Sequence, residues 1–151
     1  MQKLNLPVYD LSIDVRDGGK QYVFDPFRRK YLVLTPEEHV RQIFSRYLIE
    51  EKEYPLGYLM TEYSLKVNRM SKRCDIIIFN KDRSYLALVE CKAPDVKISQ
   101  EVFDQVARYN LAFKVSYMMV TNGLEHYCCM IDFQTRSVSF LNEIPAYPSI
   151  T

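Results

Sequence analysis

The sequence lacks the residues and patterns that mark several classes of protein. It contains no tryptophan, and none of its four cysteines forms a C-x-x-C pair. Because Cys128 lies directly beside Cys129, the cysteines suit neither a tetrahedral zinc site nor an ordinary disulfide. No apolar run approaches the ~20 residues of a membrane span, and the N-terminus lacks the continuous apolar stretch of a signal peptide. We therefore expect a cytoplasmic protein with reduced thiols and no membrane contact.

An excess of charge of one sign is also missing. Twenty lysines and arginines stand against nineteen acids, so the net charge of +1 does not indicate a strongly basic nucleic-acid-binding domain. The 151 residues, 48% of them hydrophobic, suffice for one domain with its own core. We expect residues 1–151 to form a single domain, with an N-terminal hairpin extension over 1–30, a core over 35–142 and a fraying tail over 143–151.

Local patterns predict two helices and several strands. Thr35 is placed to cap the first helix, with Pro36 at its first position and Glu38 completing a capping box. Ser99 is placed to cap a second helix that runs to about Lys114. Strand-like runs cover 8–25 (turning at 17–19), 58–66, 73–80, 85–92, 117–123, 125–133 and 137–143, with a polar turn at 68–72. This order predicts an α/β fold in which one mixed sheet is flanked by helices.

Two opposite charges stand at the end of the most apolar strand, in the stretch "LVECKAP". Glu90 and Lys92 are two residues apart and therefore share one face of the strand, while Cys91 points to the other face. In the preceding strand, Asp75 stands directly before three isoleucines, although aspartate is disfavoured in strands. If the two strands pair as a meander, the three charged side chains meet near one end of the sheet.

Two carboxylates and an ammonium group together suit chemistry on a phosphodiester. The acids are hard oxygen ligands for Mg²⁺ or Mn²⁺, and the lysine can position an attacking water and offset charge in the transition state. The alternative is a solvated sheet edge, with Asp75 capping a turn. The joint pattern Asp75-x14-Glu90-x-Lys92 favours the metal site.

The residues "RCDIIIF…LVECKAP" resemble the core motif of the PD-(D/E)xK nuclease superfamily. More narrowly, the chain is similar to the N-terminal nuclease domain of type I restriction enzyme R subunits, from "TPEEHVRQ" through "TNG". "QVARYN" places Gln105 and Tyr109 as a Q-x-x-x-Y element on one helix face. The family often has proline before the aspartate, where this chain has Cys74. The resemblance implies a restriction-endonuclease-like core.

The resemblance also implies a metal site. Asp75, Glu90 and the main-chain carbonyl of Cys91 would bind the ion. An acid of the first helix often assists in the family, and Glu37 is its best match here, although a helix N-terminus by itself also favours an acid at that position. Glu38 competes for this role, but its capping position already explains it.

Three further residues acquire roles from the resemblance. Lys92 would be the catalytic lysine, while Gln105 and Tyr109 would contact the phosphate or brace that lysine. Cations at 28–30, 66, 69, 72–73, 97 and 108 could line a phosphate groove, but acids are interleaved among them, which fits scattered surface charges equally well.

These features lead to a divalent-metal-dependent DNA endonuclease as the first hypothesis, leaving a 5′-phosphate and a 3′-hydroxyl. No G-x-x-x-x-G-K-[ST] motif occurs, so we expect no translocase motor of its own and a separate motor or specificity subunit as partner. A homodimer would allow both strands to be cut. The alternatives are a catalytically silent nucleic-acid-binding or regulatory module of a restriction-type complex, and an interaction domain whose charge cluster is a salt-bridged sheet edge.

Overall fold

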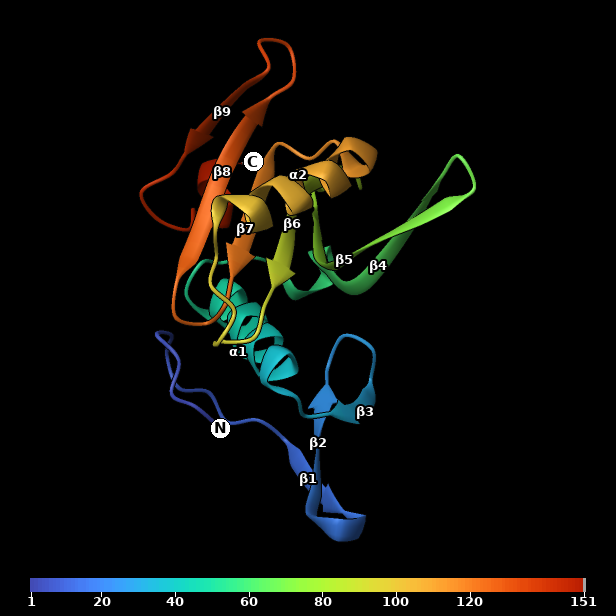
Figure 1. Cartoon of the computed structure of the whole chain (residues 1–151), viewed down its shortest axis with the longest axis vertical. Coiled ribbons are helices and arrows are strands. Elements are labelled where there is room, and N and C mark those ends of the chain that lie inside the picture. The colour runs from blue at the N-terminus through green and yellow to red at the C-terminus, as the bar shows by residue number, and fades with distance from the viewer. Residues whose placement is uncertain (151) are drawn as a thin grey trace.

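A six-stranded mixed sheet forms the centre of the protein (Figure 1). The computed structural model describes residues 1–150, without the side chains of Val67, Tyr109 and Leu111. Strands β6 and β7 are parallel, and the other neighbours are antiparallel. In spatial order, the strands are β4 (Leu59–Val67), β5 (Met70–Phe79), β6 (Tyr85–Cys91), β7 (Tyr117–Thr121), β8 (His126–Asp132) and β9 (Ser137–Phe140). The predicted α/β fold with a mixed sheet is confirmed.

A smaller antiparallel sheet precedes the core. It consists of β1 (Ile13–Arg16), β2 (Lys20–Asp25) and β3 (Lys30–Val33). The first two strands form the predicted hairpin, and their 3-10 turn, Asp17–Gly19, places Gly18 and Gly19 at φ of 72° and 81°. The third strand was not predicted from the sequence, because four residues following an arginine pair show no clear alternation.

Two helices flank the large sheet. The first, α1 (Pro36–Glu50), is capped by the Thr35 hydroxyl, which accepts the Glu38 N–H. Only this half of the expected capping box forms: the Thr35 N–H donates to the Val33 carbonyl, and the Glu38 carboxylate accepts from α1 side chains instead. The second, α2 (Gln100–Phe113), begins after Ser99 and ends at Lys114, as predicted.

The helices cover opposite faces of the sheet, and β5 shows how the sequence achieves this. Ile76 and Ile78 pack in the cluster that contains Phe44 of α1, whereas Ile77 packs in the cluster that contains Val106 of α2. A strand alternates its side chains between faces, so a strand buried on both sides is apolar at every position. The run of three isoleucines meets this requirement.

Two segments differ from expectation. The polar turn expected over 68–72 is shorter, because Val67 pairs with Met70 and the cross-strand ladder begins there. The tail does not fray over its described residues: Tyr147 starts the short helix α3 (Tyr147–Ile150), and its ring meets that of Tyr54 at 5.3 Å between centroids. A 3-10 turn, Leu56–Tyr58, precedes β4. Within residues 1–150, no helix has the length and apolar character needed to cross a membrane.

Candidate active site

The two predicted acids lie where β5 and β6 part. Backbone pairing between the strands reaches Ile76 and Val89, and the next residues are Asp75 and Glu90. Their side chains continue the connection: the Asp75 N–H donates to Glu90 Oε1 at 3.3 Å, and the Cys91 N–H donates to Asp75 Oδ2 at 2.6 Å. Each carboxylate thus accepts a hydrogen bond from the backbone of the opposite strand. These bonds hold both acids at the point where β5 and β6 separate, which we call the fork.

The pairing of β5 with β4 is also distorted at this level. Thr61 pairs with Ile76 and Tyr63 with Cys74, while Glu62 between them has a φ of 52°. A left-handed conformation at a residue with a Cβ costs on the order of 1 kcal/mol and clusters at functional positions. Glu62 is thereby placed opposite Asp75, where its charge helps to raise the pKa of that acid.

One cavity collects most of the predicted site residues. Its volume is about 450 Å³, and its lining consists of Ser64, Ser71, Arg73, Asp75, Glu90, Lys92 and Gln105. Lys92 directly follows β6, and its N–H donates to the Thr121 carbonyl at 2.8 Å, which keeps the chain beside β7. The structure therefore brings together the two acids, the lysine and the glutamine singled out in the sequence.

The remaining predicted residues are placed differently. Glu37 lines a neighbouring hollow together with Cys91. Burial, and then the charge of Asp75, raise the pKa of Glu37, so this helix acid lies within electrostatic reach of the site. Cys91 is buried against the α1 side of the sheet, as its alternation predicted. The side chain of Tyr109 lies outside the described residues.

The charge of the site is unbalanced in the protein alone. Burial and the neighbouring Asp75 raise the pKa of Glu90 to about 9, and burial also raises the pKa of Asp75. Two carboxyl groups this close do not both ionise readily, so the pair retains a proton. The charge of Lys92 only partly opposes this shift.

These donors fit a hard divalent cation that draws its other ligands from elsewhere. No group of three or more His, Cys, Asp or Glu side chains within the described part of the chain is arranged to hold a metal. Mg²⁺ commonly uses one or two carboxylates and completes its shell with water and substrate phosphate oxygens. Two adjacent carboxyl groups that retain a proton match that requirement.

A chain of ion pairs, which we did not predict, runs from the small sheet to this cavity. Its members are Asp25, Arg28, Glu38, Arg41, Glu62 and Arg73, which alternate in sign. Arg41 is 8% exposed, and its Nη1 lies 3.5 Å from Glu62 Oε1, while Arg73 Nε lies 3.0 Å from Glu62 Oε2. In the sequence, Glu38 and the arginines at 28 and 73 have other expected roles, and no local signal indicates that these residues pair with one another or that the serines line the cavity.

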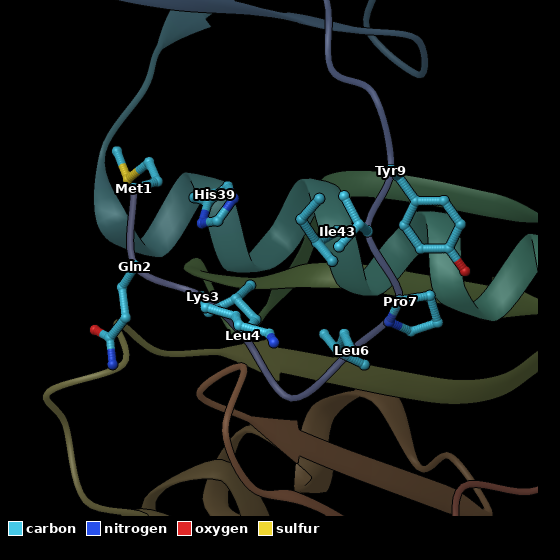
Figure 2. Close-up of a pocket in the computed structure, with 10 residues that line it drawn as sticks. Met1, Gln2, Lys3, Leu4, Leu6, Pro7, Tyr9, His39 and Ile43 are labelled. Carbon is cyan, nitrogen blue, oxygen red and sulfur yellow. The ribbon is translucent and has the colours of Figure 1, made fainter.

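A second hollow of about 280 Å³ lies under the N-terminal segment, away from the acids. Figure 2 shows this segment looping past α1 on the side of His39 and Ile43. Met1, Leu4 and Leu6 contribute to its mainly apolar lining, which includes no carboxylate. It therefore offers none of the chemistry found at the fork.

The sequence matches a known protein family. Residues 36–145 match the family described as Type I restriction enzyme R protein N terminus. No curated protein matches the sequence. Among solved structures, the chain resembles a fragment assigned to an HsdR subunit of a type I restriction enzyme from Vibrio vulnificus YJ016, with a TM-score of 0.56 and 18% identity. The match covers 78% of this chain and 24% of that one, and at this identity it concerns the fold alone.

Proposed function

Because the chain belongs to the family of type I restriction enzyme R protein N termini, we propose that it is a PD-(D/E)xK nuclease domain that hydrolyses phosphodiester bonds of DNA with Mg²⁺ or Mn²⁺. One observation carries the proposal. Asp75, Glu90 and Lys92, which are separated in sequence, line one cavity at the fork between two buried strands. A solvated sheet edge would not bury Glu90 to 8% exposure or set two acids against each other.

The residues have separate tasks in this proposal. Asp75 and Glu90 would hold the metal, with the Cys91 carbonyl as a further oxygen ligand. When bound, the ion supplies Lewis acidity and a more acidic bound water. The ammonium of Lys92 orients the attacking water and offsets negative charge that develops on the phosphate. The amide of Gln105, on the opposite wall, contacts a phosphate oxygen or holds Lys92 in place. Tyr109 and Glu37 stay supporting candidates.

The partners follow from the family and from the charge of the cavity. We propose DNA as substrate and a separate motor or specificity subunit of a restriction-type complex as protein partner. The pairing of two copies stays a prediction from mechanism.

A catalytically silent module that binds nucleic acid is the second candidate. It is favoured by the small number of acids at the fork: two carboxylates, with Glu37 in the adjacent hollow. In that case, the buried acids would serve the fold and Lys92 would contact a phosphate without turnover.

Cleavage assays separate the two candidates. The full chain is incubated with supercoiled plasmid and with single-stranded DNA, in Mg²⁺, in Mn²⁺ and with a chelator. We expect metal-dependent cutting that Asp75→Ala and Lys92→Ala each reduce by at least about 100-fold, since each group acts on the transition state. Asp10→Ala and Lys81→Ala, exposed residues away from the cavity, are the matched controls. DNA binding without cutting would support the silent module, and neither binding nor cutting would leave only a charged sheet edge.

A further inference from the structure

The hairpin of β4 and β5 continues past the body of the protein as an arm, which we define as Leu65–Arg73. In Figure 1, its tip extends to the side, clear of the helices and of the small sheet. Lys66 pairs with Ser71 and Val67 with Met70, so the ladder persists up to a two-residue turn at Asn68 and Arg69. A short turn of this kind makes the arm a stiff ribbon.

The arm concentrates positive charge that the rest of the chain does not have. Its nine residues include Lys66, Arg69, Lys72 and Arg73 and no acid, whereas the whole chain has twenty cations and nineteen acids. Lys66, Arg69 and Arg73 are exposed, and Arg73 is exposed to 69% at its side chain. The near-neutral net charge therefore hides a local positive surface on this projection.

One face of the arm leads directly into the candidate active site. Directly opposed residues of an antiparallel pair point to the same side, so the pairs Ser64–Arg73 and Lys66–Ser71 form one polar face. Ser64, Ser71 and Arg73 line the cavity that contains the two acids. Successive pairs are about 7 Å apart along the ribbon. Hydroxyl and cationic groups thus extend outward from the cavity in a row, and these are the groups that contact DNA phosphates.

The tip of the arm is a turn of two left-handed residues. Asn68 and Arg69 have φ of 52° and 67°, a pair of left-handed residues in which asparagine followed by glycine is the favoured sequence. Asparagine stands in its favoured place, but arginine occupies the position of glycine, at a cost on the order of 1 kcal/mol. A cation therefore stands at the tip, in a conformation that Arg83 and Arg136 share in their own turns.

We propose that the arm binds the sugar–phosphate backbone of duplex DNA beside the bond to be cleaved and so places that phosphate over the cavity. This inference rests on the proposed nuclease function. From Ser71 at the cavity to Arg69 at the tip, the arm reaches about 7 Å beyond the cavity, enough to contact phosphates next to the one over the cavity. The segment contains no aromatic residue, so it offers no stacking platform for a single strand.

The test removes two cations without weakening the hairpin. In Lys66→Thr/Arg69→Gly, threonine suits a strand and glycine suits the left-handed turn, so the variant should be at least as stable as wild type. The matched control is Lys81→Thr/Arg136→Gly. Arg136 is likewise an exposed arginine with positive φ, 57°, in the β8–β9 turn. Thermal unfolding verifies that both variants fold.

Binding of the full chain to a labelled short duplex is measured by anisotropy in chelator, over a range of salt concentrations, so that no cleavage occurs. We expect the arm variant to bind at least about tenfold more weakly at 0.1 M salt, and its log–log salt slope to fall by about 2, since each phosphate contact contributes about 0.9. The control should match wild type. Unchanged affinity and slope in the arm variant, an equal loss in the control, or no binding of wild type to the duplex would each overturn the proposal.

Two further measurements separate this inference from the nuclease proposal. Binding that depends on the arm, in a protein that never cuts with Mg²⁺ or Mn²⁺, would sustain the arm and reject the nuclease. Cutting and binding at wild-type levels by the arm variant would support the nuclease and reject the role of the arm. An RNA duplex of the same sequence is the competing ligand. If it binds more tightly than DNA and the arm variant loses that binding, the partner is RNA and the assignment to DNA fails.

Discussion

At the scale of single residues, Asp75 and Glu90 serve both the backbone and the site. Their carboxylates replace missing ladder bonds between β5 and β6, and burial of Glu90 beside Asp75 raises the pKa of Glu90, so the pair retains a proton. Two adjacent carboxyl groups without a cation lower the stability of the folded protein, and a bound cation in place of the proton would remove this cost. We therefore expect a substitution that removes the charge of one of these acids to have opposite effects on stability and on activity.

Glu90→Gln tests this opposition. Glutamine is a neutral side chain of nearly equal shape, so we expect the metal-free variant to be as stable as wild type or more stable by about 1 kcal/mol. Mg²⁺ at millimolar concentration should raise the Tm of wild type, since binding to the folded state adds stability, and leave that of Glu90→Gln unchanged. Cleavage should be lost. A variant that is destabilised by several kcal/mol without metal would show that the charged form of Glu90 supports the fold.

At the scale of elements, the ion-pair chain ties α1 to the small sheet and to β4 and β5. Arg41 is its central member, held between Glu38 and Glu62, and its pKa is raised by those two acids despite its burial. Glu62, in turn, contacts Arg73 at the base of the arm. The chain thus joins the first helix to the wall of the cavity.

Arg41→Met should weaken this connection strongly. It keeps an unbranched apolar stem but removes the central cation of the chain, so Glu38 keeps only the ion pair with Arg28 and Glu62 only that with Arg73. Removing one partner of a buried pair costs up to roughly 3 kcal/mol. Urea unfolding measures the loss, and Arg108→Met, an exposed arginine on α2, is the control. Arg41→Lys should recover only part of the stability, because an ammonium cannot reproduce the forked contacts of guanidinium. Equal stability of Arg41→Met and wild type would contradict a structural role for the chain.

At the scale of the whole molecule, His126 joins the N-terminal segment to the core. Its Nδ1 lies 2.7 Å from Thr121 Oγ1 and its Nε2 lies 2.9 Å from the Asn5 carbonyl. Because a carbonyl only accepts, Nε2 carries the proton and Nδ1 accepts from the threonine hydroxyl. The Asn5 N–H also donates to the Gly123 carbonyl at 2.8 Å, so the segment is fixed at two points on the β7–β8 turn.

This contact predicts a pH dependence of stability. Burial lowers the pKa of His126 below its ordinary 6.5 in the folded protein. As pH falls through 6.5, the unfolded chain takes up a proton first, so wild type loses stability relative to His126→Gln. The raised carboxyl pKa values act in the opposite sense over this range, so only the difference between the two proteins is informative. We expect that difference to change by less than about 1 kcal/mol between pH 7.5 and 5.5, because the ring is partly solvated. A constant difference would show that the ring titrates equally in both states.

Local patterns in the sequence determined the two helices with their caps, most strands of the large sheet and the trio of Asp75, Glu90 and Lys92. Caps, alternation of side chains and turn residues act over a few neighbouring positions, so they can be recognised without knowing the rest of the fold. Tertiary structure alone decided β3, the burial of Tyr147, the fork that holds the acids and the ion pairs of Glu62 with Arg41 and Arg73. These features depend on contacts between residues distant in the chain, whose formation depends on how strands and helices pack together rather than on any local preference.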